Sequence, residues 1–130
     1  MGAWAKGDIV WKAAAGSTIK TTLIDTADYT VDLVNHDFYD DIAAAAKEET
    51  SGAMTLVDGA TNGVVDASDV TFTATTGDTC EGIVLWKDTG VAATSNLLLW
   101  WDTSAGLPVT LGGDVTVQWG NVAGTLLARI

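Results

Sequence analysis

The chain has 130 residues, the size of one ordinary domain, and 48% of them are hydrophobic, enough for a substantial core. Its 17 acidic and 6 basic residues give a formal net charge of −11. This charge argues against a nucleic-acid surface, which needs clustered Lys and Arg, and equally against binding to an anionic membrane.

The first third of the chain predicts strands joined by small or acidic residues. An apolar run at residues 8–12 is followed by a small-residue turn at 13–17, and the β-branched residues of 18–24 predict a strand. Residues 25–35 form a polar, acidic connection. The start of the chain lacks the basic and apolar regions of a secretory signal, and no apolar run approaches ~18 residues. We therefore expect folding in a cytoplasm and no membrane partner.

One short helix is predicted at residues 37–47. Phe38, Ile42 and either Ala45 or Ala46 recur at helical spacing, and Asn35 is a candidate N-cap. Asp37, Asp40 and Asp41 fall in the first turn, where the helix dipole favours negative charge.

Strands dominate the remainder. The expected strands are residues 49–57, 64–66, 70–75, 80–87, 96–101, 114–119 and 124–130. Residues 83–86 are apolar at both the odd and the even positions, which point to opposite faces of a strand. We therefore expect this strand to be covered on both faces. Short strands between Gly, Asp and Asn clusters are typical of an antiparallel β-sandwich. The fold class expected is mainly β, a jelly-roll-like antiparallel sandwich with one short helix.

No residue pattern indicates catalysis, and we expect neither an enzyme nor a cofactor. The only histidine, His36, lies among carboxylates and is expected to be a surface or capping residue. The only cysteine, Cys80, excludes an intrachain disulfide and is expected to be a buried small hydrophobe. The acidic segment 25–41 leaves two alternatives open, a calcium site or a solvated acidic loop.

Six tryptophans are more informative. Trp100 and Trp101 are adjacent, so in a strand they must point to opposite faces, and one of them needs a second covering surface. Trp4 and Trp11 lie near the N-terminus. Large core residues remain the alternative to an interface role. We predict these four as partner-interface residues, because tryptophan is a favoured interface anchor.

An ordered set of phrases runs from about residue 18 to the C-terminus. The phrases are LIDTADYT at 23–30, HDF at 36–38, TSGA at 50–53, DASDVTF at 66–72, VLWKDTG at 84–90, DT at 102–103, GLPVT at 106–110 and GGDVTVQW at 112–119. In this order they resemble a family of small tailed-phage virion structural proteins. The resemblance implies a component of a phage particle, assembled in the host bacterial cytoplasm.

Two roles in such a particle are compatible with the sequence. The first is a capsid decoration, or cement, protein, expected as a homotrimer that binds across major capsid proteins and stabilises the assembled head. The alternative is a tail-fibre or receptor-binding module that uses exposed tryptophans. We expect residues 1–17 to form a docking arm and residues 18–130 to form a single β-sandwich domain.

Overall fold

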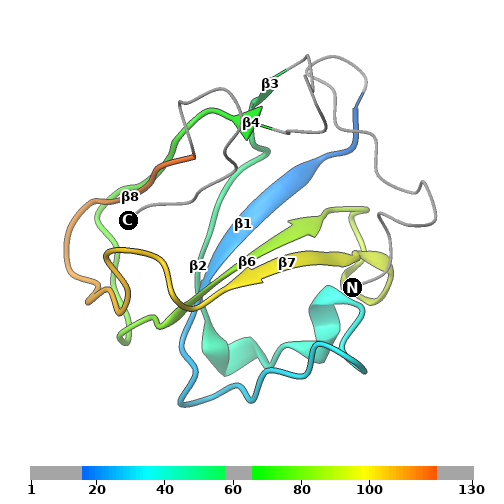
Figure 1. The fold of residues 1–130 in the computed structure, drawn as a ribbon, viewed down its shortest axis with the longest axis horizontal. Helices are drawn as coiled ribbons and strands as arrows, with labels where there is room; N and C mark the ends of the chain where they lie inside the picture. The colour runs from blue at the N-terminus through cyan, green and yellow to red at the C-terminus, as the bar shows by residue number, and fades with distance from the viewer. Residues whose placement is uncertain (1–15, 58–65, 120–130) are drawn as a thin grey trace.

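The computed structural model describes residues 16–57 and 66–119, and its main element is a four-stranded antiparallel sheet (Figure 1). In spatial order the strands are β2 (Lys47–Thr50), β1 (Ile19–Ile24), β6 (Gly82–Lys87) and β7 (Leu97–Trp101). The long central pair is in register throughout, with Ile19 opposite Lys87 and Ile24 opposite Gly82. Because β1 pairs with β6, which is distant from it in the sequence, the fold is held mainly by long-range contacts.

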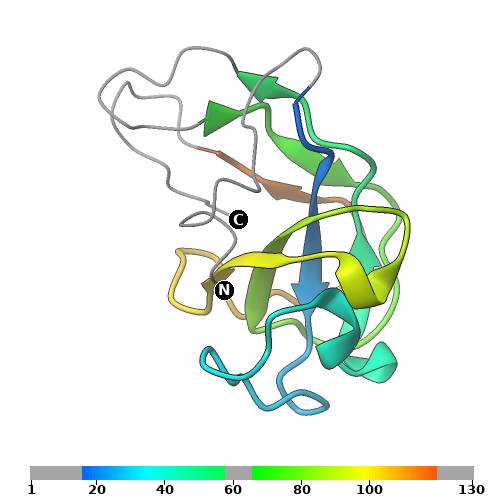
Figure 2. The same ribbon diagram turned by 90° about the vertical axis from the view of Figure 1, so that its right-hand side faces the viewer.

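Two short antiparallel strand pairs accompany this sheet. One pair is β3 (Leu56–Val57) with β4 (Asp66–Ala67), and the other is β5 (Val70–Phe72) with β8 (Val115–Val117). Both pairs lie at the end of the molecule opposite the short helical turns (Figures 1 and 2). The prediction of a mainly β fold with antiparallel sheets is therefore confirmed.

The predicted helix at 37–47 is wrong. The described residues contain no α-helix and only three 3-10 turns: η1 (Tyr39–Asp41), η2 (Ala44–Ala46) and η4 (Ala92–Thr94). Between the first two turns the backbone is extended, with ψ of 125° at Ile42 and 142° at Ala43. The Asp41 carboxylate accepts the backbone N–H groups of Asp37 and Phe38, each at 2.9 Å. Such local side-chain bonds compete with helix propagation.

The four-stranded sheet has an apolar cluster on each face. On one face Ile83 and Leu85 of β6 join a cluster that includes residues from both strand pairs, among them Leu56 and Phe72. On the other face Val84 and Trp86 join a cluster formed with the loop after β1 and the two turns that follow it. The prediction that residues 83–86 are covered on both faces is confirmed. Alternate side chains of one strand therefore supply two cores.

β7 carries the adjacent tryptophans to opposite faces, as predicted. Trp101 packs against the cluster shared with the strand pairs, and Trp100 packs against the cluster on the loop side. The pairing of β6 with β7 is irregular between Leu85 and Trp86. A bulge of this kind adds one residue and changes which side chains face each side of a strand. Leu98 and Leu99 accordingly lie against the same cluster.

Most other strand predictions are confirmed with shorter bounds. The strand expected at 49–57 is instead two strands, β2 and β3, which pair with different partners. The apolar run at 8–12, the strand expected at 124–130, most of the one at 64–66, and the arm at 1–17 up to residue 15 lie outside the described residues. Within residues 16–57 and 66–119, no helix is long and apolar enough to cross a bilayer.

Candidate functional site

Three carboxylates meet beyond the end of β1. Asp25 follows β1, Glu48 lies on β2 and Asp78 lies in the turn before β6, and their oxygens are within 4.8 Å of one another. Asp25 is buried, Glu48 half-buried and Asp78 exposed. Such a group of oxygens could hold a hard cation such as Ca²⁺. However, Asp25 Oδ1 already accepts the N–H of Ala27 at 2.7 Å, and Glu48 Oε2 accepts that of Asp78 at 3.1 Å.

The acidic segment 25–41 contributes only Asp25 to this group. Two other acids of the segment stabilise turns, Asp41 as described above and Asp32 in the loop after β1. Asp32 Oδ1 accepts the N–H groups of Val34 and Asn35, each at 2.9 Å, and its Oδ2 accepts the Asn35 amide at 2.8 Å. The hydrogen bonds from Asn35, then that from Val34, lower the pKa of Asp32. Glu48 and Asp78 lie outside this segment in the sequence, so the concentration of acidic residues at 25–41 did not predict their contribution.

His36 supports the same loop. Its Nδ1 lies 2.8 Å from the hydroxyl of Tyr29, and the two ring centroids are 5.5 Å apart. Tyr29 is buried in the cluster on the loop side, and this burial raises the pKa of its hydroxyl. The histidine therefore ties residues 29–36 to the core, and the Asn35 side chain binds Asp32 instead of capping a helix.

Cys80 is fully buried, as predicted. Its backbone forms an antiparallel bridge with Val109, with both N–H···O bonds at 2.9 Å. Burial, and then the negative charges of Glu48 and Glu81, raise the pKa of its thiol to about 12. The thiol is therefore protonated at neutral pH.

This burial predicts slow alkylation. At pH 8 the native thiol has about one thiolate in ten thousand, whereas an unfolded thiol near pKa 8.5 has about a quarter. Iodoacetamide should therefore label Cys80 orders of magnitude faster in urea than in buffer, as followed by mass spectrometry. Since the native pKa is raised, the fold should also lose stability as the pH rises above about 8.5. Rapid labelling of the native protein at pH 8 would show that the thiol is accessible.

The four predicted interface tryptophans are only partly described. Trp4 and Trp11 lie outside the described residues. Trp100 is half-buried, 6.0 Å from the Tyr29 ring, and its indole N–H donates to Asp102 Oδ2 at 3.2 Å. Trp101 is also half-buried and meets Trp119 edge-on, with centroids 5.3 Å apart. Both indoles therefore have intramolecular contacts, and their role at an interface stays a prediction.

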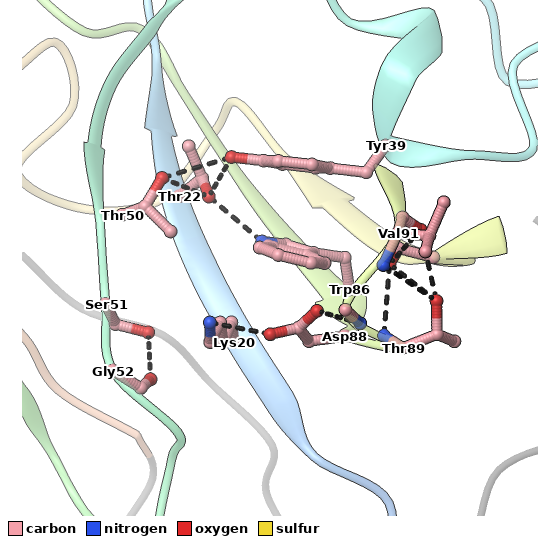
Figure 3. A network of polar contacts seen from close by, with 12 residues as sticks. Lys20, Thr22, Tyr39, Thr50, Ser51, Gly52, Trp86, Asp88, Thr89 and Val91 are labelled. Atoms are coloured by element: carbon pink, nitrogen blue, oxygen red, sulfur yellow. Dashed lines mark hydrogen bonds and ion pairs between the residues drawn. The ribbon is translucent and has the colours of Figure 1, made fainter. Parts of the chain in front are cut away.

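An aromatic and threonine network covers the loop-side face (Figure 3). The Trp86 ring stacks on Tyr39, with centroids 3.8 Å apart and planes 11° from parallel, and its N–H donates to Thr22 Oγ1 at 3.0 Å. Thr22 Oγ1 also lies 3.2 Å from the Tyr39 hydroxyl and 3.1 Å from Thr50 Oγ1. Lys47 lies over the outer face of this pair, 4.1 Å from the Tyr39 centroid. No pattern in the sequence predicted that residues 22, 39, 50 and 86 would be in contact.

Lys20, on β1, also contacts this network. Its ammonium lies 5.6 Å from the Trp86 centroid and pairs with Asp88 Oδ2 at 2.6 Å (Figure 3). The hydrogen bond from Lys20, then that from the Gly90 N–H, lowers the pKa of Asp88. The network therefore joins β1, β6 and η1 through their side chains. The faces of its two aromatic rings contact each other and the two lysines rather than solvent.

Comparison of the sequence with models of protein families and with curated proteins gives no match.

Proposed function

We propose that this protein is a structural component of a tailed-bacteriophage particle and decorates the outer surface of the assembled capsid. What carries the proposal is the resemblance of the ordered phrases in the sequence to those of small tailed-phage virion proteins. Its partner would be the major capsid protein, and residues 1–17, with Trp4 and Trp11, would act as a docking arm.

The positions of these phrases in the structure support the proposal, because several of their polar residues hold the fold together. Asp69 Oδ1 accepts the N–H of Trp119 at 3.0 Å, and Asp88 Oδ1 accepts that of Gly90 at 2.8 Å. Asp114 Oδ1 accepts the N–H of Ala74 at 2.9 Å. A resemblance at such positions favours a shared fold. A function inferred in this way is an argument by analogy.

We also propose that the domain is a jelly-roll-like β-sandwich. One apolar cluster joins the four-stranded sheet to both short strand pairs, which is the arrangement expected of a jelly-roll-like β-sandwich. Closed symmetric oligomers are the common form of proteins at symmetry axes, and we propose a homotrimer.

The reactive side chains of the described residues support a binding role over a catalytic one. The imidazole of His36 is paired with Tyr29, and the thiol of Cys80 is buried and protonated. A mechanism that used His36 as a base or Cys80 as a nucleophile would need that group free to approach a substrate. The tail alternative relies on exposed tryptophans, and the partial burial of Trp100 and Trp101 supports it less.

The proposal is tested by removing the protein from particles. Binding only to the assembled lattice stabilises that lattice by mass action. Phage particles stripped of the protein should therefore release their DNA at a lower temperature than intact particles, and adding back purified protein should restore the resistance. Stripped particles with unchanged resistance, and no rebinding of the protein, would reject a decoration role.

A further inference from the structure

The loop between β1 and η1 exposes two consecutive apolar side chains in the turn after Asp32, which we call the tip. Leu33 is 55% exposed and Val34 is 83% exposed, the largest value among the exposed large hydrophobic residues of the described chain. The loop lies at the lower end of the molecule in Figure 2, away from the two strand pairs. A single exposed apolar residue needs no explanation, but an adjacent pair at a projecting tip is a candidate contact surface.

This tip is held in one conformation. The Asp32 carboxylate accepts hydrogen bonds from the backbone N–H groups of Val34 and Asn35. The backbone N–H of His36 donates to the Asp32 carbonyl at 3.1 Å. The side chains of His36 and buried Tyr29 connect the turn to the core. These bonds order a segment that buries neither Leu33 nor Val34 within the chain. A surface ordered in advance loses less conformational entropy when it binds.

The charge around the tip limits what it can bind. Residues 25–41 contain six aspartates and neither lysine nor arginine. Asp28, Asp40 and Asp41 are exposed. A second copy of this loop would bring the same negative charges into contact, and nucleic acid would be repelled. A protein surface with an apolar depression and a rim of Lys and Arg is complementary in both respects.

We propose that Leu33 and Val34 insert into an apolar depression on a basic protein surface, with exposed aspartates of segment 25–41 paired to its rim. This inference rests on the proposed function, in which that surface belongs to the capsid lattice. Asp32 acts as a positioning residue that holds the tip.

The experiment compares two valine-to-serine variants of the full chain. Val34→Ser changes the tip, and Val91→Ser is its matched control, because Val91 is 58% exposed but precedes η4, outside the loop. Each variant is added to particles stripped of the native protein, and bound protein is measured by co-sedimentation. We expect binding about tenfold weaker for Val34→Ser, because burial of a valine side chain contributes about that factor. Binding of Val91→Ser should stay within about twofold of the native value.

Two further measurements identify the occupant. Native binding should weaken as the salt concentration rises, and Asp28→Lys should weaken it further at low salt. Tighter binding of Asp28→Lys would overturn the basic partner. An altered oligomeric state of Val34→Ser in analytical ultracentrifugation would identify a second copy as the occupant and would also overturn it.

The two proposals fail in different ways. If native protein does not bind stripped particles, the proposed function is wrong. If native protein and Val34→Ser bind equally well, the decoration role stands and the docking loop is wrong. Thermal unfolding of each variant shows whether it is folded, and exposed substitutions of this kind usually change stability little.

Discussion

Replacing Trp86 with alanine should lower the free energy of unfolding by about 3–5 kcal/mol. The side chain is buried, stacks on Tyr39 and donates its N–H to Thr22. Its removal leaves a cavity between the four-stranded sheet and η1, and it also removes the stacking contact with Tyr39. Urea denaturation followed by circular dichroism measures the loss. A loss below about 1 kcal/mol would show that the turn is not held by this residue.

A double-mutant cycle isolates the hydrogen bond from the packing. Thr22→Val removes the acceptor and leaves the buried indole N–H without it, which should cost about 1–3 kcal/mol. Tyr39 and Thr50 keep each other as partners at 3.1 Å. In a Trp86→Phe background no indole N–H remains, so Thr22→Val should cost less by about 0.5 kcal/mol or more. Strictly additive losses would show that the bond contributes nothing.

The second large effect is expected at Gly82, the first residue of β6. Alanine here should cost about 1–3 kcal/mol, because its Cβ would lie 2.2 Å from Cη2 and 2.5 Å from Cζ2 of Trp100. The indole must then leave its place against Tyr29 and Asp102. Gly52→Ala is the matched control, since nothing lies within 4 Å of a Cβ at that position. Equal stabilities of the two variants would contradict the contact.

The cause of this loss can be tested separately. In a Trp100→Ala background the ring is absent, so adding Gly82→Ala should cost at least about 1 kcal/mol less than it does in the native background. The indole N–H resonance of Trp100 should shift in Gly82→Ala and stay in place in Gly52→Ala. An unshifted resonance would mean that the backbone moves instead of the ring.

Strand positions were largely predictable from local patterns. Residues 83–86 are apolar at both parities, and that pattern alone predicts a strand between two cores, which the structure confirms. The opposite orientations of Trp100 and Trp101 follow from the period of two in a strand. The burial of Cys80 follows from its apolar surroundings in the sequence.

The helix at 37–47 could not be rejected from spacing alone. Ile42 and Ala46 are both buried, as the helical pattern predicts, but an extended step between two 3-10 turns brings them inward. Asp41 favours this arrangement by accepting backbone N–H groups at the start of the segment. Aspartate at such a position suits either a helix N-terminus or a tight turn, so its identity alone does not distinguish the two.

The side-chain clusters were beyond sequence reasoning for a different reason. The carboxylates of Asp25, Glu48 and Asp78 meet only because β1 pairs with both β2 and β6. The stack of Trp86 on Tyr39 depends equally on strand order. A chain without regular repeats contains no local signal for strand order. The resemblance to phage proteins therefore supplied a hypothesis of function that residue patterns alone did not.

The most direct test of the proposed decoration role is the copy number of this chain in purified phage particles, measured by quantitative mass spectrometry against the major capsid protein. A decoration protein that covers the capsid should be present in numbers on the order of hundreds per particle, in a fixed ratio to the capsid subunit. A handful of copies would favour the tail instead. Absence of the chain from particles would contradict the account.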